Sequence, residues 1–266
     1  MATVNPQRLI QGSGTAEAAW QAWLQSGGIS TCLLREWVPR TARLVVVAPH
    51  PDDEVLACGG LVAMHRDQGG DVAVIAVTDG EASHADSPLW NAAALAVARH
   101  GERTAGLRQL GVPADVVTRL ALPDGGVVHY ILRLALKLQM LLRPSDVVVT
   151  TWRLDGHPDH EATGLAASLA CPVVGCRLIE APVWMWHWAN PGDPFVPWHR
   201  MQRLPLKPHA HERKQAALAA HASQLDALQR PGGPVLDRAI VARARRADEY
   251  YFSEPPHAHA AHSRVF

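Results

Sequence analysis

The hydrophobic pattern of the chain alternates between short apolar runs and longer segments with apolar residues at helical spacing. Residues 44–48 (LVVVA) and 72–78 (VAVIAVT) are continuous apolar runs, typical of strands buried on both faces. Residues 54–66 between them have the spacing of a helix, and a turn signal at residues 67–71 (DQGGD) precedes the second run. The pattern therefore predicts a strand, a helix and a second strand.

The same unit recurs further along the chain. The predicted elements are a helix at residues 91–110, a strand at 116–122, a helix at 128–142 and a strand at 146–151. Strands that alternate with helices are typical of doubly wound sheets. We therefore predict an α/β fold, with a Rossmann-like, mostly parallel sheet and helices on both of its faces.

The two ends of the chain are less regular. Apolar residues at helical spacing predict a helix at residues 15–26. Residues 177–188 (RLIEAPVWMWHW) alternate like a strand, which would place three indoles on one face, those of Trp184, Trp186 and Trp188. Core packing or a subunit interface is the first interpretation of these indoles, and stacking on a ligand is the second.

A further strand within residues 201–206 and a helix at residues 211–225 complete the predicted elements. We treat residues 1–266 as a single domain, because no linker or internal repeat divides the chain. Its parts are an N-terminal extension (1–42), a core (about 43–225) and a C-terminal segment (226–266).

The composition of the chain limits the classes of binding partner and the cellular compartment that we expect. Lys and Arg number 25, as do Asp and Glu, so no net charge favours nucleic acid or an anionic membrane. The first residues lack the pattern of a signal peptide, and no run of about 18 apolar residues occurs. The four cysteines form no CxxC pair, as expected of thiols in a reducing compartment. We therefore predict a cytoplasmic protein without a membrane span.

Polar motifs follow four of the predicted strands. They are residues 50–53 (HPDD), 78–81 (TDGE), 122–125 (LPDG) and 152–160 (WRLDGHPDH). In a doubly wound sheet, ligands bind beyond the carboxyl ends of the strands. The active site is therefore predicted at the C-terminal strand ends, where these motifs meet.

Two histidines and one carboxylate in these motifs form a metal-ligand set. His50, Asp53 and His160 are ligand types that suit zinc, and a set of three leaves coordination positions open for water and substrate. Zn²⁺ is the predicted cofactor, and Fe²⁺ fits the same donors. The alternative for the aspartates is a capping role at the start of the following helix.

Three further residues are predicted to be catalytic. Asp52 is adjacent to a ligand, where it can take a proton from water as the general base. His157 is expected to face the developing oxyanion as an imidazolium. Asp159 is expected to orient His157 or another histidine of the site and to keep it charged.

These motifs resemble, in order, those of the PIG-L/LmbE-like family of zinc-dependent N-acetylglucosaminyl de-N-acetylases. The resemblance covers roughly residues 43–225 and rests on HPDDE and HPDH, together with TDGE, RHGE (99–102), LPDG and KQAALAAHASQ (214–224). It implies metal ligands at His50, Asp53 and His160, a general base at Asp52 and an oxyanion-stabilising His157.

The resemblance implies a substrate-binding role for Arg99, for which an ion pair with Glu102 on the same helix is the alternative. Glu81 and Asp124 are at strand ends, where they are predicted to bind sugar hydroxyls; capping, or support of other site residues, is the alternative. Two weaker substrate-binding candidates come from the Trp-rich segment, Trp184 and His187.

We therefore expect a deacetylase that removes an N-acetyl (N-acyl) group from an N-acetylglucosamine-type amino-sugar conjugate, and releases acetate and a free amine. Besides the small-molecule substrate, the predicted partner is a second copy of the same chain, in a homo-oligomer. One alternative is a metal-dependent phosphoesterase with Mg²⁺ on Asp52 and Asp53, against which the two histidines argue. The other is a catalytically idle sugar-binding protein, against which the presence of Asp52 and His157 argues.

Overall fold

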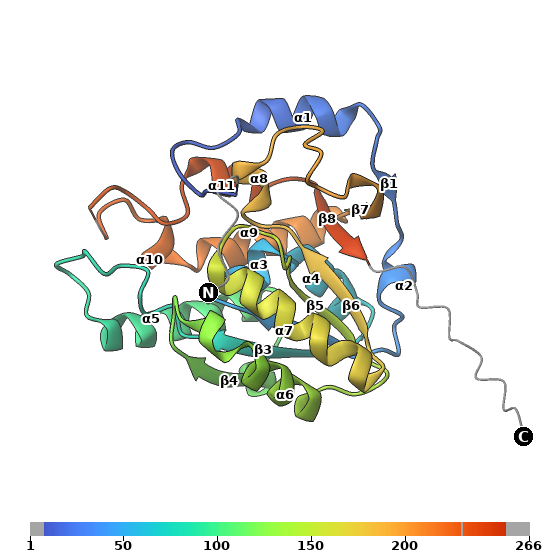
Figure 1. The fold of residues 1–266 in the computed structure, drawn as a ribbon, viewed down its shortest axis with the longest axis horizontal. Helices are drawn as coiled ribbons and strands as arrows, with labels where there is room; N and C mark the ends of the chain where they lie inside the picture. Colours follow the sequence, from blue (N-terminus) through green and yellow to red (C-terminus); the bar gives the residue numbers. More distant parts are fainter. Residues whose placement is uncertain (1–7, 230, 254–266) are drawn as a thin grey trace, which may run out of the picture.

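An eight-stranded sheet with helices on both faces organises the molecule (Figure 1). The computed structural model describes residues 8–229 and 231–253. The strands are β1 (Ser30–Thr31), β2 (Leu44–Ala48), β3 (Val72–Thr78), β4 (Val117–Leu122), β5 (Val147–Thr151), β6 (Arg177–Ala181), β7 (Met201–Pro205) and β8 (Asp248–Ser253). Their order in the sheet is β1-β7-β8-β6-β5-β2-β3-β4.

Most of the helices connect consecutive strands, as a doubly wound fold requires. The α-helices are α1 (Glu17–Gln25), α2 (Leu34–Trp37), α3 (Asp53–Leu56), α4 (Gly59–Asp67), α5 (Ala92–Gln109), α6 (Ile131–Leu141), α7 (Pro158–Val174), α8 (Met185–Trp188), α9 (Pro208–Ala219), α10 (Ala222–Leu225) and α11 (Arg238–Ala244). Short 3₁₀ turns are η1 (Ala114–Val116), η2 (Val127–Tyr130) and η3 (Trp198–Arg200).

The strand order confirms the predicted α/β class. The strands β6, β5, β2, β3 and β4 are parallel neighbours, whereas β8 runs antiparallel to both β6 and β7. The chain passes from β2 outward to β3 and β4, then returns to the other side of β2 to form β5. The order therefore reverses between β2 and β5, which is where such sheets bind ligands.

Alternating side chains of β2 belong to two separate cores. Leu44 and Val46 pack into the core that includes residues of α4, α5 and α9, and Val45 and Val47 pack into the core with α6 and α7. Every residue of β2 is buried, which explains why its sequence is continuously apolar. Figure 1 shows α6 and α7 together on one face of the sheet.

The single helix predicted at residues 54–66 is wrong, because two helices, α3 and α4, occupy this segment. The carboxylate of Glu249 accepts hydrogen bonds from the backbone N–H groups of Gly60 and Leu61, both at 2.8 Å, and so caps the start of α4. The Lys214 ammonium lies 2.7 Å from the same carboxylate. The capping group comes from a distant strand, so no local pattern could predict the break.

The strand predicted at residues 177–188 is correct only for its first half. β6 ends at Ala181, and α8 follows. The Asp155 carboxylate accepts the backbone N–H groups that start this turn, those of Val183, Trp184 and Met185. The predicted row of indoles on one strand face is therefore wrong. Trp186 packs into a separate aromatic core, with its ring centroid 5.0 Å from that of Trp20 on α1.

Both ends of the described chain join the sheet. The N-terminal extension supplies β1 beside β7, and residues after 226 supply β8, a strand that the hydrophobic pattern did not reveal. The four cysteines are free thiols. Within residues 8–229 and 231–253, no helix combines the length and apolar character needed to cross a bilayer.

His221, between α9 and α10, gives the fold a pH dependence. Its ring is fully buried, and neither ring nitrogen has a hydrogen-bond partner among the residues that the structure describes. Burial, together with the charges of Arg99 and Arg103, lowers the pKa of His221 to about 3. In the unfolded chain a histidine takes up its proton near pH 6.5. Stability from the neutral ring is therefore complete above that pH and is lost as the pH falls from about 6.5 toward 3.

We expect the His221→Leu variant to lose less stability on acidification than the wild type. Between pH 7 and pH 5, the difference in unfolding free energy between the two proteins should change by about 2 kcal/mol in favour of the variant. Urea unfolding at a series of pH values measures this. His100→Leu, at an exposed position of α5, serves as the control and should follow the wild type. Parallel pH profiles for wild type and His221→Leu would contradict the assignment.

Candidate active site

The candidate site lies at the C-terminal ends of β2 and β5, which are neighbours in the sheet. Residues 49–53 follow β2, and residues 152–160 follow β5 and lead into α7. His157 is the N-cap of α7, and Pro158 occupies its first turn. The reversal of strand order therefore brings together two histidine motifs that are about a hundred residues apart in the sequence.

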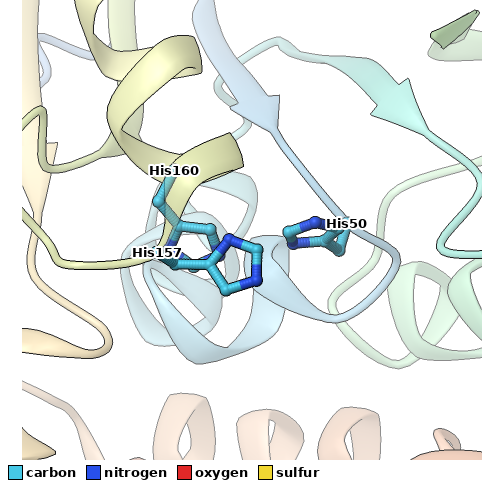
Figure 2. A group of neighbouring side chains, drawn as sticks. All are labelled: His50, His157 and His160. Atoms are coloured by element: carbon cyan, nitrogen blue, oxygen red, sulfur yellow. The ribbon is translucent and has the colours of Figure 1, made fainter. Parts of the chain in front are cut away.

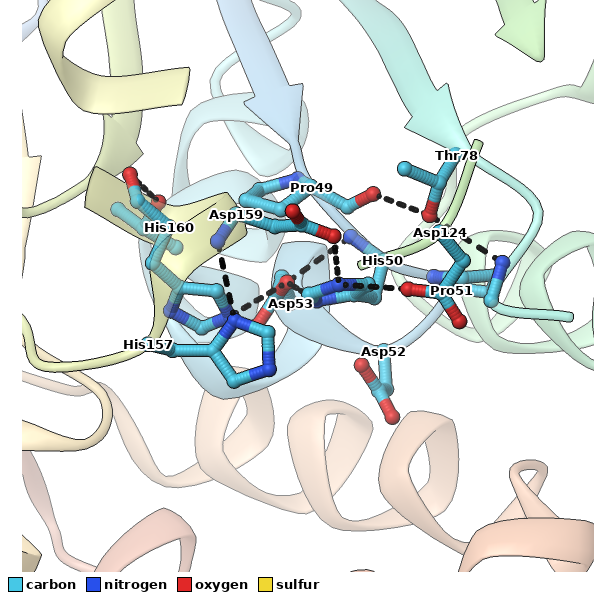
Figure 3. Close-up of polar contacts among 12 residues, drawn as sticks. Pro49, His50, Pro51, Asp52, Asp53, Thr78, Asp124, His157, Asp159 and His160 are labelled. Atoms are coloured by element: carbon cyan, nitrogen blue, oxygen red, sulfur yellow. Dashed lines mark hydrogen bonds and ion pairs between the residues drawn. The ribbon is translucent and has the colours of Figure 1, made fainter. Parts of the chain in front are cut away.

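Asp53 lies between two histidine rings (Figure 3). Its Oδ2 atom is 3.1 Å from His50 Nδ1 and 3.2 Å from His160 Nε2. The same oxygen accepts the backbone N–H of His50 at 3.0 Å. The structure therefore brings the three predicted metal ligands into direct contact.

Each of these histidines uses its other ring nitrogen to contact buried carboxylates. His160 Nδ1 is 2.8 Å from Asp155 Oδ2, and His50 Nε2 is 3.2 Å from an oxygen of Asp159 and of Asp124. A carboxylate behind a metal-binding histidine commonly fixes the tautomer and the orientation of the ring. Both rings have this support, and each directs its remaining nitrogen toward the site.

The ring of His157 is close to the same two histidines (Figure 2). One nitrogen from each of His50, His157 and His160 lies within 4.8 Å of the other two. His50 also forms a group of this spacing with Asp124 and Asp159. This spacing makes His157 an alternative third ligand beside His50 and His160, whereas Asp53 is the residue that contacts both of their rings.

Negative charge dominates this cluster. Burial alone would lower the pKa of His160, but Asp53 and Asp155 outweigh it and raise this pKa to about 9. Burial acts in the same direction on His50, and its carboxylate neighbours nevertheless raise its pKa well above the ordinary value. The site therefore favours positive charge, which protons on the rings or a bound divalent cation would supply.

Asp52 has surroundings different from those of Asp53. Its Oδ2 is 3.0 Å from Arg99 Nη2, and its φ of 142° lies in a region that residues other than glycine rarely adopt. Burial raises the pKa of Asp52 to about 7 against the opposing charge of Arg99, and Asp53 adds to the rise. A carboxylate with such a pKa suits proton transfer at neutral pH.

His157 differs from the predicted imidazolium. Burial and the neighbouring rings of His160 and His50 lower the pKa of His157 well below its ordinary value, so the ring is neutral. Its Nδ1 accepts the backbone N–H of Asp159 at 3.3 Å, which leaves the proton on Nε2. A neutral imidazole can still donate that hydrogen bond to an oxyanion. The carboxylate of Asp159 contacts His50 instead, the second of the two predicted arrangements.

A cavity of about 310 Å³ opens over this cluster. Polar residues of its wall include Asp52, Arg99 and Asp124, all at strand ends or on α5. Its apolar residues include Leu56, Trp184, Val235 and Leu236. The cavity thus presents carboxylates and a guanidinium together with apolar groups, one of them an indole.

Arg99 lines the cavity and also holds the loops around it. Its guanidinium donates to the carbonyls of Gly80 and Pro51 at 2.8 and 2.9 Å. Gly80 has a φ of 68°, and a Cβ there would collide with the guanidinium of Arg99, so the close approach requires glycine. The alternative pair with Glu102 is not formed, because the Glu102 carboxylate accepts hydrogen bonds from Ser223.

The remaining predicted residues divide into two groups. Asp124 and Trp184 line the cavity, and the Trp184 ring is stacked against that of His157 with centroids 6.3 Å apart. Glu81 and His187 do not line it. Glu81 accepts the backbone N–H of Asp124 and so supports the loop, whereas His187 bonds the carbonyl of Gln11.

Asp155 is the important residue that the sequence analysis missed. It is fully buried, and in addition to His160 it binds three backbone N–H groups at the start of α8. It therefore connects a predicted metal ligand to the segment that carries Trp184. Its position two residues before the HPDH motif was the available signal, since an aspartate there can reach a histidine of the same loop.

We expect Asp155→Asn to weaken metal binding by about 10- to 100-fold. The new amide NH₂ would face both the His160 ring and the N–H of Trp184, where the carboxylate now accepts. Competition with a chelating dye measures the affinity. The control is Asp146→Asn, which changes a buried aspartate paired with Arg43 at the opposite end of β5. Equal metal affinity in the two variants would contradict this role for Asp155.

Comparison with known proteins identifies a family for part of the chain. Residues 45–171 match the GlcNAc-PI de-N-acetylase (PIG-L) family. This part of the chain belongs to the PIG-L family. It contains the predicted metal ligands and catalytic residues, whereas Trp184 and His187 lie beyond it. The sequence resemblance to the family is confirmed.

The chain is also similar in sequence to individual proteins of known name, over a shorter part of its length. A 1D-myo-inositol 2-acetamido-2-deoxy-alpha-D-glucopyranoside deacetylase of Mycobacterium sp. (strain KMS) is 38% identical over 97 residues, which are 34% of this chain and 30% of that protein. The chain therefore matches less than a third of the length of that relative. Similarity to solved structures extends over more of the chain.

Two solved structures share the fold over most of this chain. The conserved protein TT1542 from Thermus thermophilus has a TM-score of 0.58 and 27% identity, and the match covers 84% of this chain and 99% of that one. An N,N'-diacetylchitobiose deacetylase from Pyrococcus horikoshii has a TM-score of 0.58 and 21% identity, with coverage of 80% and 81%. The fold outside residues 45–171 is thus also similar to known structures.

Proposed function

We propose that this chain is a metal-dependent hydrolase that removes the N-acetyl group of an N-acetylglucosamine-type conjugate. The observation that carries the proposal is the arrangement of His50 and His160. Each ring is held by a carboxylate on one nitrogen and directs the other toward Asp53, beside a cavity that also contains Asp52 and His157. The PIG-L match and the activity named for the mycobacterial relative support the same reaction.

The donor set fits a divalent metal. Two imidazoles and a carboxylate are ligands for zinc, and iron(II) accepts the same donors. The excess of buried carboxylates around the rings gives such a cation its compensating charge. We assign His50, Asp53 and His160 as the residues that would hold it. When bound, a metal of this kind supplies Lewis acidity toward water and an amide carbonyl.

The protein's own groups complete the chemistry. Asp52 accepts a proton from the water that attacks the acetyl carbon, and its position beside Arg99 fixes its carboxylate. The Nε2–H of His157 donates to the oxygen on which negative charge develops. As the C–N bond breaks, the proton held by Asp52 passes to the leaving nitrogen. One water and one amide thus give acetate and a free amine.

The cavity supports a sugar as the substrate. Its carboxylates and guanidinium can bind hydroxyl groups, and the indole of Trp184 offers an apolar face for a ring. The mycobacterial relative is named for a 2-acetamido sugar, and the Pyrococcus horikoshii enzyme is named for N,N'-diacetylchitobiose. We also place the reaction in the cytoplasm, which the four free thiols support.

Release of primary amine from a panel of N-acetylglucosaminyl conjugates tests the proposal. We expect amine and acetate in equal amounts, and no phosphate from matched sugar phosphates. Phosphate release without amine would instead support the phosphoesterase alternative. Binding of the sugars without turnover by metal-loaded protein would identify a sugar-binding protein, and either result would overturn the proposed reaction.

A further inference from the structure

Two adjacent helices on the face opposite α4 and α9 expose an unusual amount of apolar surface. Six of the thirteen large hydrophobic side chains that are exposed in the described residues lie on α6 and α7. They are Leu132, Leu136 and Met140 on α6, and Leu165, Leu169 and Val173 on α7. We refer to these six residues as the α6–α7 patch.

The spacing within the patch is regular. Both sets of three residues recur at every fourth position, so each forms one stripe along its helix. The opposite faces of the helices, including Leu134, Leu138 and Ala166, are buried against the sheet. Both helices therefore have an apolar stripe facing outward in addition to the stripe that packs in the core.

The two stripes lie side by side. α6 and α7 pack against each other on one face of the sheet, as Figure 1 shows. Each helix leads from the C-terminal end of one parallel strand to the start of the next, so the two helices run in the same direction. The patch is consequently a continuous two-helix face rather than two isolated ridges.

The size of the patch matches half of a stable interface. The six side chains are 40–77% exposed, which corresponds to an apolar area on the order of 600 Å², at the upper end for the largest patch on a soluble monomer. Two such patches in contact would bury about 1,200 Å², the lower end for specific protein interfaces. One patch against its own copy therefore reaches the area that the smaller specific interfaces bury.

We propose that the α6–α7 patch is the interface at which two copies of this chain associate around a two-fold axis. An axis that crosses the helices sets α6 of one copy antiparallel to α6 of the other, and α7 antiparallel to α7, which forms a four-helix arrangement with opposed helix dipoles. Arg133, in the first turn of α6, then lies near the C-terminal end of α6 in the second copy, where a cation is favourable. The catalytic cavities remain open, because none of the six residues lines them.

A second copy accounts for the patch better than a lipid surface does. Helices that bind membranes usually combine apolar residues with Trp or Phe and a strongly charged polar face. The α6–α7 patch contains only Leu, Met and Val, and the cations that α6 itself carries in the described structure are Arg133 and Lys137. Aliphatic stripes on paired helices are instead the pattern of helix–helix packing.

Sedimentation velocity of the full chain over a range of concentrations tests this interface. We expect the wild type to have about twice the mass of the 28.8 kDa chain, and we expect Leu136→Glu and Leu169→Glu each to weaken dimerisation by at least about 100-fold. Circular dichroism and amine release show whether the variants remain folded. The control is Val97→Glu, at an exposed apolar position on α5, which should remain dimeric.

Three results would overturn the proposal. The first is a wild type that stays monomeric up to about 100 μM, a concentration at which interfaces of this size associate. The second is a dimer that neither glutamate variant weakens. The third is flotation of the wild type, but not of Leu136→Glu, with phosphatidylcholine–phosphatidylserine vesicles, which would assign the patch to a membrane surface. Because both activity and mass are measured, loss of the dimer is distinguishable from failure of the proposed reaction.

Discussion

Asp52→Asn is expected to lower kcat for amine release by about 10³-fold, a typical value for loss of a general base. The side chain of the variant has nearly the same size, but it cannot accept the proton of the attacking water. Asp52 contacts Arg99, whereas Asp53 contacts both histidines, so the metal content should equal that of the wild type. Turnover of an N-acetylglucosaminyl conjugate and metal analysis on the same preparation measure both quantities.

The matched control for Asp52→Asn is Asp79→Asn. Asp79 is also a buried aspartate after a parallel strand, but it pairs with Arg119 and does not line the cavity. We expect its turnover to stay within a few-fold of the wild type. If Asp52→Asn loses its metal, Asp52 is a ligand and the assignment of base and ligand is reversed. If it retains full turnover, another group is the base.

Asp53→Ala is expected to abolish stoichiometric metal binding, whereas His157→Ala is expected to retain it. The spacing of the three histidines favours His157 as the third ligand, but Asp53 is the residue whose single oxygen contacts both supported rings. Removing one of three ligands leaves a site too weak to keep the metal through purification. Metal analysis of both variants after dialysis distinguishes the two assignments.

Turnover adds a second criterion to this comparison. His157→Ala should lower kcat by about 10²- to 10³-fold, as expected for loss of one oxyanion donor. It should do so with the metal still bound. Loss of the metal from His157→Ala, with retention by Asp53→Ala, would assign the three-histidine group of Figure 2 as the metal site.

The regular middle of the chain was predictable because its signals are local. The continuous apolar runs of β2 and β3 reflect burial on both faces, and their predicted bounds match the observed strands. The rule that ligands bind beyond the C-terminal strand ends then placed four motifs on one edge. The contacts between Asp53 and the two histidines follow from that topology and needed no long-range information about side chains.

The errors arose where a distant residue determines the local structure. The break between α3 and α4 depends on Glu249, and the turn that replaces the second half of the strand predicted at residues 177–188 depends on Asp155. The neutral state of His157 is also a tertiary effect, since burial and two nearby imidazoles produce it. Sequence spacing contains no information on burial of this kind, so the predicted imidazolium could not have been corrected from the sequence.

Amine release from an N-acetylglucosaminyl conjugate, followed before chelation, after chelation and after zinc is restored, tests the central claim most directly. We predict that turnover disappears with the metal, returns with zinc, and stays low throughout in Asp52→Asn. Amine release that persists in fully metal-free protein, or that is unchanged in Asp52→Asn, would contradict the proposed function of this site.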